Sequence, residues 1–290
     1  MNGPVLAVHG GAGGHTEDLR EHTTEIHAAL ASALTAGADA LGRRNGDAVE
    51  AVRAAVMVLE AFPLFNAGYG SALCSDGSVE LSASVMRGSD RAAGGVAMMT
   101  RTAHPVAAAV ALLDEPEVLL VGACADDHAA ANGLEQRAPA EFVTERQRQN
   151  LADRMTGGPE TVGAVCLDTT GLLAAATSTG GLSGQRPGRV GDSPLIGAGT
   201  WADHGVAISC TGQGEAFIRA GAARLVAALV EHGHALETAA QEALEAVAEC
   251  GGNGGLIAVD AHGSVTTPRS TAAMPRGVWR PGQNPVTAVP

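Results

Sequence analysis

The stretch TVGAVCLD, residues 161–168, organises the rest of this 290-residue chain. Small or β-branched residues alternate with apolar ones along it, and residues 168–171 (DTTG) are typical of a turn, so the pattern predicts a buried strand that ends in a hairpin. Residues 171–178 (GLLAAATS) predict the partner strand, and residues 156–160 (TGGPE) predict a loop before Thr161. Thr161 is therefore expected where a loop meets a rigid sheet.

The composition narrows the class of protein. Apolar residues make up 46% of the chain but aromatic residues only 2%, so a core of Ala, Val, Leu and Ile is expected. Lys plus Arg number 18 against 31 Asp plus Glu, a net charge of 18 − 31 = −13. This charge disfavours nucleic acid or an anionic membrane surface as partner and favours a small-molecule or dipeptide substrate.

Cysteine usage and apolar runs give the expected compartment. The five cysteines show no CxxC spacing, and the N-terminus lacks the pattern of a signal peptide. No uncharged apolar run reaches about 18 residues, the length expected of a membrane span. We therefore expect a cytoplasmic protein without membrane association.

Outward from residue 161, the periodicity of apolar residues predicts a mixed α and β chain. Strands are expected at 4–9, 78–86, 94–100, 206–212 and 256–260. Helices are expected at 23–41, 47–61, 104–113, from 117 onward, 216–232 and 236–250. Residues 125–158 are polar and predict a helical or disordered connector.

Several common catalytic motifs are missing from the sequence. There is no HExxH, no GxSxG, and the glycines at 10–14 do not complete GxGxxG because residue 16 is Thr. A threonine nucleophile is compatible with the sequence, because a chain-initial threonine can be activated by its own α-amino group, whose pKa is roughly 7.7–8.0. Such a site requires a chain break before Thr161.

Two further segments carry candidate binding groups. Arg189 and Asp192 stand three residues apart in a loop, where they could hold the carboxylate and the ammonium of an amino acid, or form an internal salt bridge. Thr211 and Gly212 end a predicted strand directly before a helix, a position where backbone N–H groups can bind an oxyanion.

Taken together, seven segments resemble the plant-type asparaginase / isoaspartyl peptidase family of N-terminal nucleophile hydrolases, in its threonine type. They are HGGAG (9–13), PLFNAGYG (63–70), TVGAVCLD (161–168), ATSTGG (176–181), PGRVGDSP (187–194), SCTGQGE (209–215) and GGLIAVD (254–260). The resemblance implies an α+β fold, a four-layer αββα sandwich, as one domain over residues 1–290. It also implies self-cleavage between Glu160 and Thr161 into an α subunit, 1–160, and a β subunit, 161–290.

By matched position the resemblance implies a role for each site residue. Thr161 would be the nucleophile and, through its freed amine, the base, with Thr179 bonded to it and Asn66 above it. Thr211 and Gly212 would form the oxyanion hole. Arg189 would bind the substrate α-carboxylate and Asp192 its α-amine, with Gly214 on the amine side. Gly212 would contact the substrate as well.

The resemblance further implies no cofactor for catalysis, and a dimer of αβ units, which is a heterotetramer after cleavage. It also implies a structural sodium ion. Its ligands would be the backbone carbonyls of Leu59, Glu60, Phe62, Phe65, Ala67 and Tyr69.

The expected activity is hydrolysis of β-aspartyl dipeptides and L-asparagine through a β-aspartyl ester on Thr161. The chain departs from the family pattern at Glu160, where Gly or Asp is usual, at Ser82, where Asp is usual, and in RSTAAMPRG, residues 269–277. Two alternatives stay open: a relative specialised for another amide such as glycosylasparagine, and an unprocessed, non-catalytic aspartate-binding protein.

Overall fold

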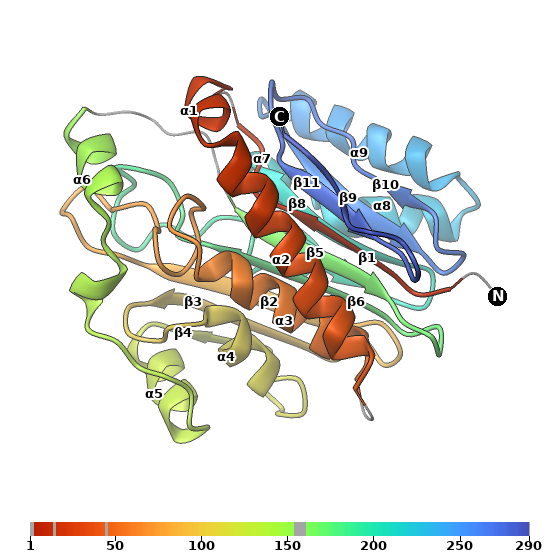
Figure 1. Ribbon diagram of the computed structural model, residues 1–290, viewed down its shortest axis with the longest axis horizontal. Helices are drawn as coiled ribbons and strands as arrows, with labels where there is room; N and C mark the ends of the chain where they lie inside the picture. Colours follow the sequence, from red (N-terminus) through yellow and green to blue (C-terminus); the bar gives the residue numbers. More distant parts are fainter. Residues whose placement is uncertain (1–2, 14–15, 44–45, 154–160, 290) are drawn as a thin grey trace.

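The computed structural model describes residues 3–13, 16–43, 46–153 and 161–289. These residues form two β-sheets with helices on their outer faces (Figure 1). Among the described residues, no helix combines the length and the apolar character needed to cross a bilayer.

The larger sheet has eight strands in the order β12-β11-β1-β5-β6-β2-β3-β4, antiparallel except for the parallel pair β3–β4. Its strands are β1 (Val5–His9), β2 (Leu81–Arg87), β3 (Ala93–Met99), β4 (Leu119–Val121), β5 (Val162–Leu167), β6 (Leu173–Thr179), β11 (Arg276–Trp279) and β12 (Val286–Ala288). The predicted hairpin beginning at Thr161 is confirmed, since β5 and β6 pair antiparallel at the centre of this sheet.

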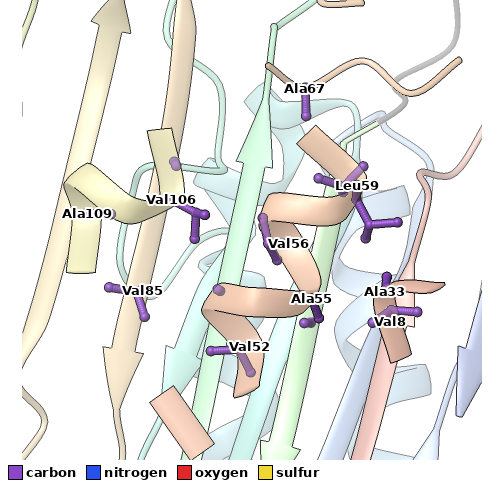
Figure 2. Close-up of a cluster of buried hydrophobic side chains, with 14 of the residues drawn as sticks. Val8, Ala33, Val52, Ala55, Val56, Leu59, Ala67, Val85, Val106 and Ala109 are labelled. Carbon is purple, nitrogen blue, oxygen red and sulfur yellow. The ribbon is translucent and has the colours of Figure 1, made fainter. Parts of the chain in front are cut away.

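One face of the larger sheet is covered by α2 (Thr23–Leu41), α3 (Ala48–Glu60) and α4 (Pro105–Ala111) (Figure 1). Figure 2 shows how α3 does this: Val52, Val56 and Leu59 point into a cluster that also contains Val85 of β2 and Val106 of α4. Most side chains of this cluster are Ala, Val, Leu or Ile, as the low aromatic content predicts.

The smaller sheet has four antiparallel strands in the order β10-β9-β8-β7. They are β7 (Thr200–Ala202), β8 (Val206–Gly212), β9 (Gly254–Asp260) and β10 (Val265–Thr266). A second apolar cluster lies between the two sheets and includes Val165 and Ala175 from the larger sheet and Ala207 and Ile257 from the smaller one.

The smaller sheet's other face packs against helices. These are α7 (Gly214–Ala220), α8 (Ala222–Glu231) and α9 (Leu236–Glu249), which with β8 and β9 enclose a third apolar cluster. The remaining helices are α1 (Thr16–Glu21), α5 (Ala123–Ala131), the 3-10 turn η1 (Pro139–Phe142) and α6 (Glu145–Ala152). In Figure 1, α5 and α6 lie at the side of the molecule, away from the smaller sheet.

Two predicted helices are wrong in detail. The helix expected from residue 117 is instead the short edge strand β4, followed by α5. The helix expected over 216–232 starts at Gly214 and is divided at Gly221, whose φ of 59° is left-handed. The strands β7, β10, β11 and β12 were not predicted, because two to four residues are too few to show a period of two.

Candidate active site

Three polar residues stand in one row across the centre of the larger sheet. The register of β5 with β6 pairs Val162 with Ser178, which brings Thr161 opposite Thr179, and β2 pairs Ser82 with Thr179 on the other side. Directly paired residues place their side chains on the same face of a sheet. Thr161, Thr179 and Ser82 are all almost fully buried.

The two threonines are joined through their hydroxyls. Thr161 Oγ1 donates to Thr179 Oγ1 over 3.1 Å, and the backbone N–H of Gly181 donates to the same Thr179 oxygen, also over 3.1 Å. Thr179 is therefore fixed by the turn that follows it, and it fixes the Thr161 side chain in turn. The predicted contact between Thr161 and Thr179 is present.

A histidine that the sequence did not single out lies beside this row. His9 on β1 is fully buried; it pairs with Gly163, and its Nε2 lies 2.9 Å from Ser209 Oγ. Its Nδ1 accepts the N–H of Gly11, which leaves the proton on Nε2. Burial lowers the pKa of His9 to about 3 against the opposing effect of the Thr161 backbone, so the ring is neutral near pH 7.

Ser209 continues this contact into a buried chain of hydroxyls between the two sheets. Ser209 Oγ lies 2.7 Å from Thr177 Oγ1, which accepts from Thr200 Oγ1 over 2.6 Å. Gly163 lies against the start of the chain, and a Cβ there would stand 2.5 Å from His9 Nε2 and overlap Ser209 Oγ. This network was not predicted from the sequence; hydroxyl residues on otherwise apolar strands are the signal that could have indicated it.

The two residues expected to form an oxyanion hole are held from opposite sides. Thr211, which is fully buried, accepts the N–H of Ala12 on Oγ1 over 3.0 Å, so its own hydroxyl hydrogen stays available for another acceptor. A Cβ on Gly212 would lie 2.5 Å from Asn253 O and from Phe217 Cε2, so only glycine fits there. The glycine loop 10–13 thus meets the end of β8.

Arg189 does not pair with Asp192, which was the internal salt bridge left open by the sequence. Its Nε and Nη2 donate to the two carboxylate oxygens of Glu215 over 2.9 and 3.0 Å. Glu215 follows Gly214 in the first turn of α7 and was not predicted as a site residue. Arg189 is mostly buried, whereas Glu215 is about half exposed.

Asp192 is buried with one oxygen unused. Among the described residues its Oδ2 has no hydrogen-bond partner. Burial raises the pKa of Asp192 to about 7; Arg189 opposes this shift and Glu215 adds to it. A Cβ on Gly214 would stand 2.9 Å from Asp192 Oδ1 and 3.0 Å from Arg189 Nη2, so Gly214 lies against both charged groups.

Comparison with known proteins explains why these residues occur together. A family model described as asparaginase matches residues 2–160 and 152–289. The chain belongs to this asparaginase family. It is 42% identical to the isoaspartyl peptidase of Salmonella typhimurium, over 100% of this chain and 99% of the relative. The isoaspartyl peptidase of Escherichia coli is 40% identical over 100% and 97%, and the human isoaspartyl peptidase/L-asparaginase 38% over 97% and 94%.

Within this asparaginase family member, Asn66 is tied to the turn after Thr179. Its Nδ2 donates to Gly181 O and its Oδ1 accepts the N–H of Ala72, each over 2.7 Å, while its own carbonyl accepts from Gly180 N. Asn66 therefore fixes the Gly180–Gly181 turn against the 66–72 loop. Among the hydrogen bonds of the described residues, none joins Asn66 to Thr161.

Two of the three departures from the family pattern can be located. Ser82 Oγ accepts the N–H of Met98 over 3.4 Å, at a β-bulge in which Met98 has a φ of 56°. The segment 269–277 supports the glycine loop, since Gly10 N donates to Pro275 O and Gly13 pairs with Ala273. Glu160, half of the expected cleavage site, lies outside the described residues.

The loop expected to hold sodium brings oxygen donors together. The carbonyls of Leu59, Glu60 and Phe62 each accept one backbone N–H, which leaves a second lone pair on each. Gly68 and Gly70, with φ of 55° and 101°, fold the loop back, and a Cβ on them would lie 2.6 Å from Glu60 O and 3.0 Å from Phe65 O. Carbonyl oxygens suit a hard cation. Among described residues, no cluster of three His, Cys, Asp or Glu could hold a metal.

Proposed function

We propose that this protein is a threonine-type amidohydrolase that cleaves β-aspartyl (isoaspartyl) dipeptides and L-asparagine. The observation that carries the proposal is the buried Thr161–Thr179 hydroxyl pair at the head of β5. It is supported by relatives named isoaspartyl peptidase or isoaspartyl peptidase/L-asparaginase over nearly their whole length.

The proposal includes self-processing. Cleavage between Glu160 and Thr161 would give an α subunit, 1–160, and a β subunit, 161–290, within one domain. The new terminus would head a central strand of the sheet, so the freed amine stays in place beside its own hydroxyl. The arrangement of two sheets between two helix layers supports a four-layer αββα sandwich of the N-terminal nucleophile type.

The charged pair provides the recognition that an aspartyl head group needs. Arg189 would bind the α-carboxylate and Asp192 the α-ammonium, with Gly214 between them. The unpartnered Oδ2 of Asp192 supports this role, because a buried carboxylate oxygen without a partner is costly and a bound ammonium removes that cost. Binding of the cation would also favour the ionised form of Asp192.

The chemistry follows from these placements. Thr161 Oγ1 attacks the side-chain carbonyl carbon of the substrate, and its proton passes to the free α-amine of Thr161. The Thr211 hydroxyl and the N–H of Gly212 stabilise the oxyanion; one such donor is typically worth about 10²–10³ in rate. Protonation of the departing amine leaves a β-aspartyl ester on Thr161, and water then releases aspartate.

No cofactor takes part in this scheme. We propose a structural sodium ion at the carbonyls of Leu59, Glu60, Phe62, Phe65, Ala67 and Tyr69, where it would stiffen the loop that carries Asn66. We also propose a dimer of αβ units, a cytoplasmic location, and no nucleic-acid or membrane partner; the net charge of −13 supports the last point.

The test combines intact mass and activity. Purified protein, incubated for days near neutral pH, should be cleaved between Glu160 and Thr161 into two fragments. It should also release aspartate from L-asparagine and from β-aspartyl dipeptides. Thr161→Ala should do neither. Wild-type hydrolysis by the Thr161→Ala variant would contradict the mechanism. Turnover of glycosylasparagine alone would assign another amide, and aspartate binding by an unbroken chain without turnover would assign a binding protein.

A further inference from the structure

The hydrogen bonds of Arg189 leave one edge of its guanidinium group open. A guanidinium carries five N–H groups in a fixed plane. Glu215 takes the Nε–H and one Nη2–H, and Gln185 Oε1 lies 3.4 Å from Nη1. Among the described residues, one N–H on Nη1 and one on Nη2 have no acceptor. Because Glu215 holds the Nε side, the remaining Nη2–H points to the end of the group opposite its stem.

That open end lies at the proposed substrate site. A Cβ on Gly191 would stand 2.9 Å from Nη1 and 3.2 Å from Nη2, and a Cβ on Gly214 would stand 3.0 Å from Nη2 and 2.9 Å from Asp192 Oδ1. Both residues are glycines, so neither of these two positions carries a side chain that would cover Nη1 or Nη2. A carboxylate placed there would accept both in parallel, close to the unpartnered oxygen of Asp192.

Glu215 is the residue that decides which edge remains open. It holds the side of the guanidinium with two short hydrogen bonds, and it comes from the first turn of α7, directly after Gly214. Since the helix fixes its backbone, Glu215 also fixes the rotation of the Arg189 plane relative to Gly214 and Asp192. Without this partner, Arg189 would keep its charge, but its planar guanidinium group would lose its fixed orientation.

We propose that Glu215 is a positioning residue for substrate recognition: it clamps one side of Arg189 so that the opposite end receives the substrate α-carboxylate with both N–H groups. The inference rests on the proposed function of the site. It adds a residue that acts through Arg189 and does not touch the substrate itself.

A competing role for Glu215 predicts the opposite result. If Glu215 were a placeholder for the substrate carboxylate, its removal would free Arg189 and lower KM. It would also remove a negative charge that repels the substrate. If Glu215 positions Arg189, its removal raises KM, because the fork loses its orientation. The direction of the change in KM therefore separates the two.

The experiment compares Glu215→Ala and Glu215→Gln with wild type and with Glu50→Ala. Glu50 is a matched control, because it also lies in the first turn of a helix and holds Arg53 through Nε and Nη2, on the outside of α3. The measurements are kcat and KM for L-asparagine, and inhibition by L-aspartate, by β-alanine, which lacks the α-carboxylate, and by succinate, which lacks the α-amine.

We expect Glu215→Ala to raise KM and the inhibition constant of L-aspartate about 10–100-fold, equivalent to about 1.4–2.8 kcal/mol, with kcat within about threefold of wild type. Inhibition by succinate should weaken by about the same factor as inhibition by L-aspartate, whereas the inhibition constant of β-alanine should change less than threefold. Glu215→Gln keeps one acceptor oxygen, so its KM and its inhibition constant for L-aspartate should lie between those of wild type and Glu215→Ala. Glu50→Ala should have the kcat and KM of wild type.

Each outcome has a definite meaning. A lower or unchanged KM in Glu215→Ala, or an equal loss for β-alanine and L-aspartate, overturns the positioning role. Failure of the wild-type protein to hydrolyse these amides overturns the proposed function instead. Since Thr161 lies directly before β5 and Glu215 lies on α7, chain cleavage in the Glu215 variants should equal wild type, and intact mass shows this independently of the kinetics.

Discussion

Thr179 receives two hydrogen bonds on one oxygen, from Thr161 Oγ1 and from the N–H of Gly181, each of 3.1 Å. The Thr179 hydroxyl therefore orients the Thr161 hydroxyl but is itself oriented by the backbone. Thr179→Ala should lower kcat about 10–100-fold, because Thr161 loses the contact that fixes its side chain, whereas Thr179→Ser should stay within about fivefold. Steady-state kinetics with L-asparagine measures both values of kcat. An equal loss of kcat in Thr179→Ala and Thr179→Ser would contradict the role of the Thr179 hydroxyl.

Thr211 offers a test of oxyanion stabilisation. Thr211→Val keeps the shape of the side chain but removes the hydroxyl that would bind the oxyanion and that accepts from Ala12 N. We expect kcat to fall about 10²–10³-fold with a small change in KM. Thr211→Ser should recover most of the rate. A Thr211→Val variant with wild-type kcat would leave the oxyanion to Gly212 alone.

Asp192 should make recognition depend on pH. Its pKa is raised to about 7 in the free protein, chiefly by burial, and the ionised form is needed to bind an ammonium. The value of kcat/KM for L-asparagine should therefore fall as the pH drops below about 7. The α-amine that the proposed cleavage would free on Thr161 has an ordinary pKa of roughly 7.7–8.0, in a neighbouring range. Succinate, however, has no amine for Asp192 to bind. Inhibition by L-aspartate should therefore weaken as the pH drops below about 7, whereas inhibition by succinate should not.

The same carboxyl group should lower stability at high pH. Because its pKa is raised on folding from roughly 3.9 to about 7, the folded state holds the extra proton between these values, and stability falls as the pH rises through that interval. Asp192→Asn should therefore be more stable than wild type at pH 8, by about 2–4 kcal/mol, with the difference closing near pH 4. Urea unfolding at both pH values measures it.

A control for the Asp192 experiment is Asp203→Asn. Asp203 is buried as well, but its carboxylate accepts N–H groups from Trp201, Gly205 and Val206. This variant should lose stability at pH 8, the opposite sign to Asp192→Asn. Equal losses in the two variants would show that Asp192 is satisfied within the protein and does not await a ligand.

Gly163 tests the packing between β5 and the buried His9–Ser209 contact. A methyl group there would overlap Ser209 Oγ and press on His9 Nε2, so Gly163→Ala should destabilise the protein by about 2–4 kcal/mol and abolish activity. Gly42→Ala is the matched control, since its φ is −75° and its nearest neighbour would be 3.5 Å away. Thermal unfolding of the two variants should differ clearly in Tm; equal Tm values would contradict the predicted overlap.

The sodium proposal predicts a dependence on the cation. Replacing sodium chloride by choline chloride at equal ionic strength should lower Tm, because an ion that binds only the folded state stabilises it by RT ln(1 + c/Kd), where c is the sodium concentration. Addition of a chelator of divalent metals should change neither Tm nor kcat. An identical Tm in both salts would contradict the proposed sodium site.

Local sequence patterns were enough for the main elements of the fold. The alternation in residues 161–168 predicted β5, and the spacing of apolar residues predicted α2 over residues 23–41 and β8 over 206–212 with the bounds that the structure has. The resemblance placed Thr161 beside Thr179, which the structure confirms as a contact. These predictions succeed because they depend on neighbouring residues: local sequence sets the periods of strands and helices and the short turn between paired strands.

Contacts between distant segments could be decided only by the tertiary structure. Arg189 binds Glu215 and not Asp192, because a loop and the first turn of α7 meet there. The three-residue spacing in the sequence had left an Arg189–Asp192 salt bridge open. The bond from His9 to Ser209 joins residues 200 positions apart. The sequence by itself determined which elements form and which chemical groups are present. The packing of two sheets face to face decided which groups meet, since such contacts depend on register and burial and leave no local period to read.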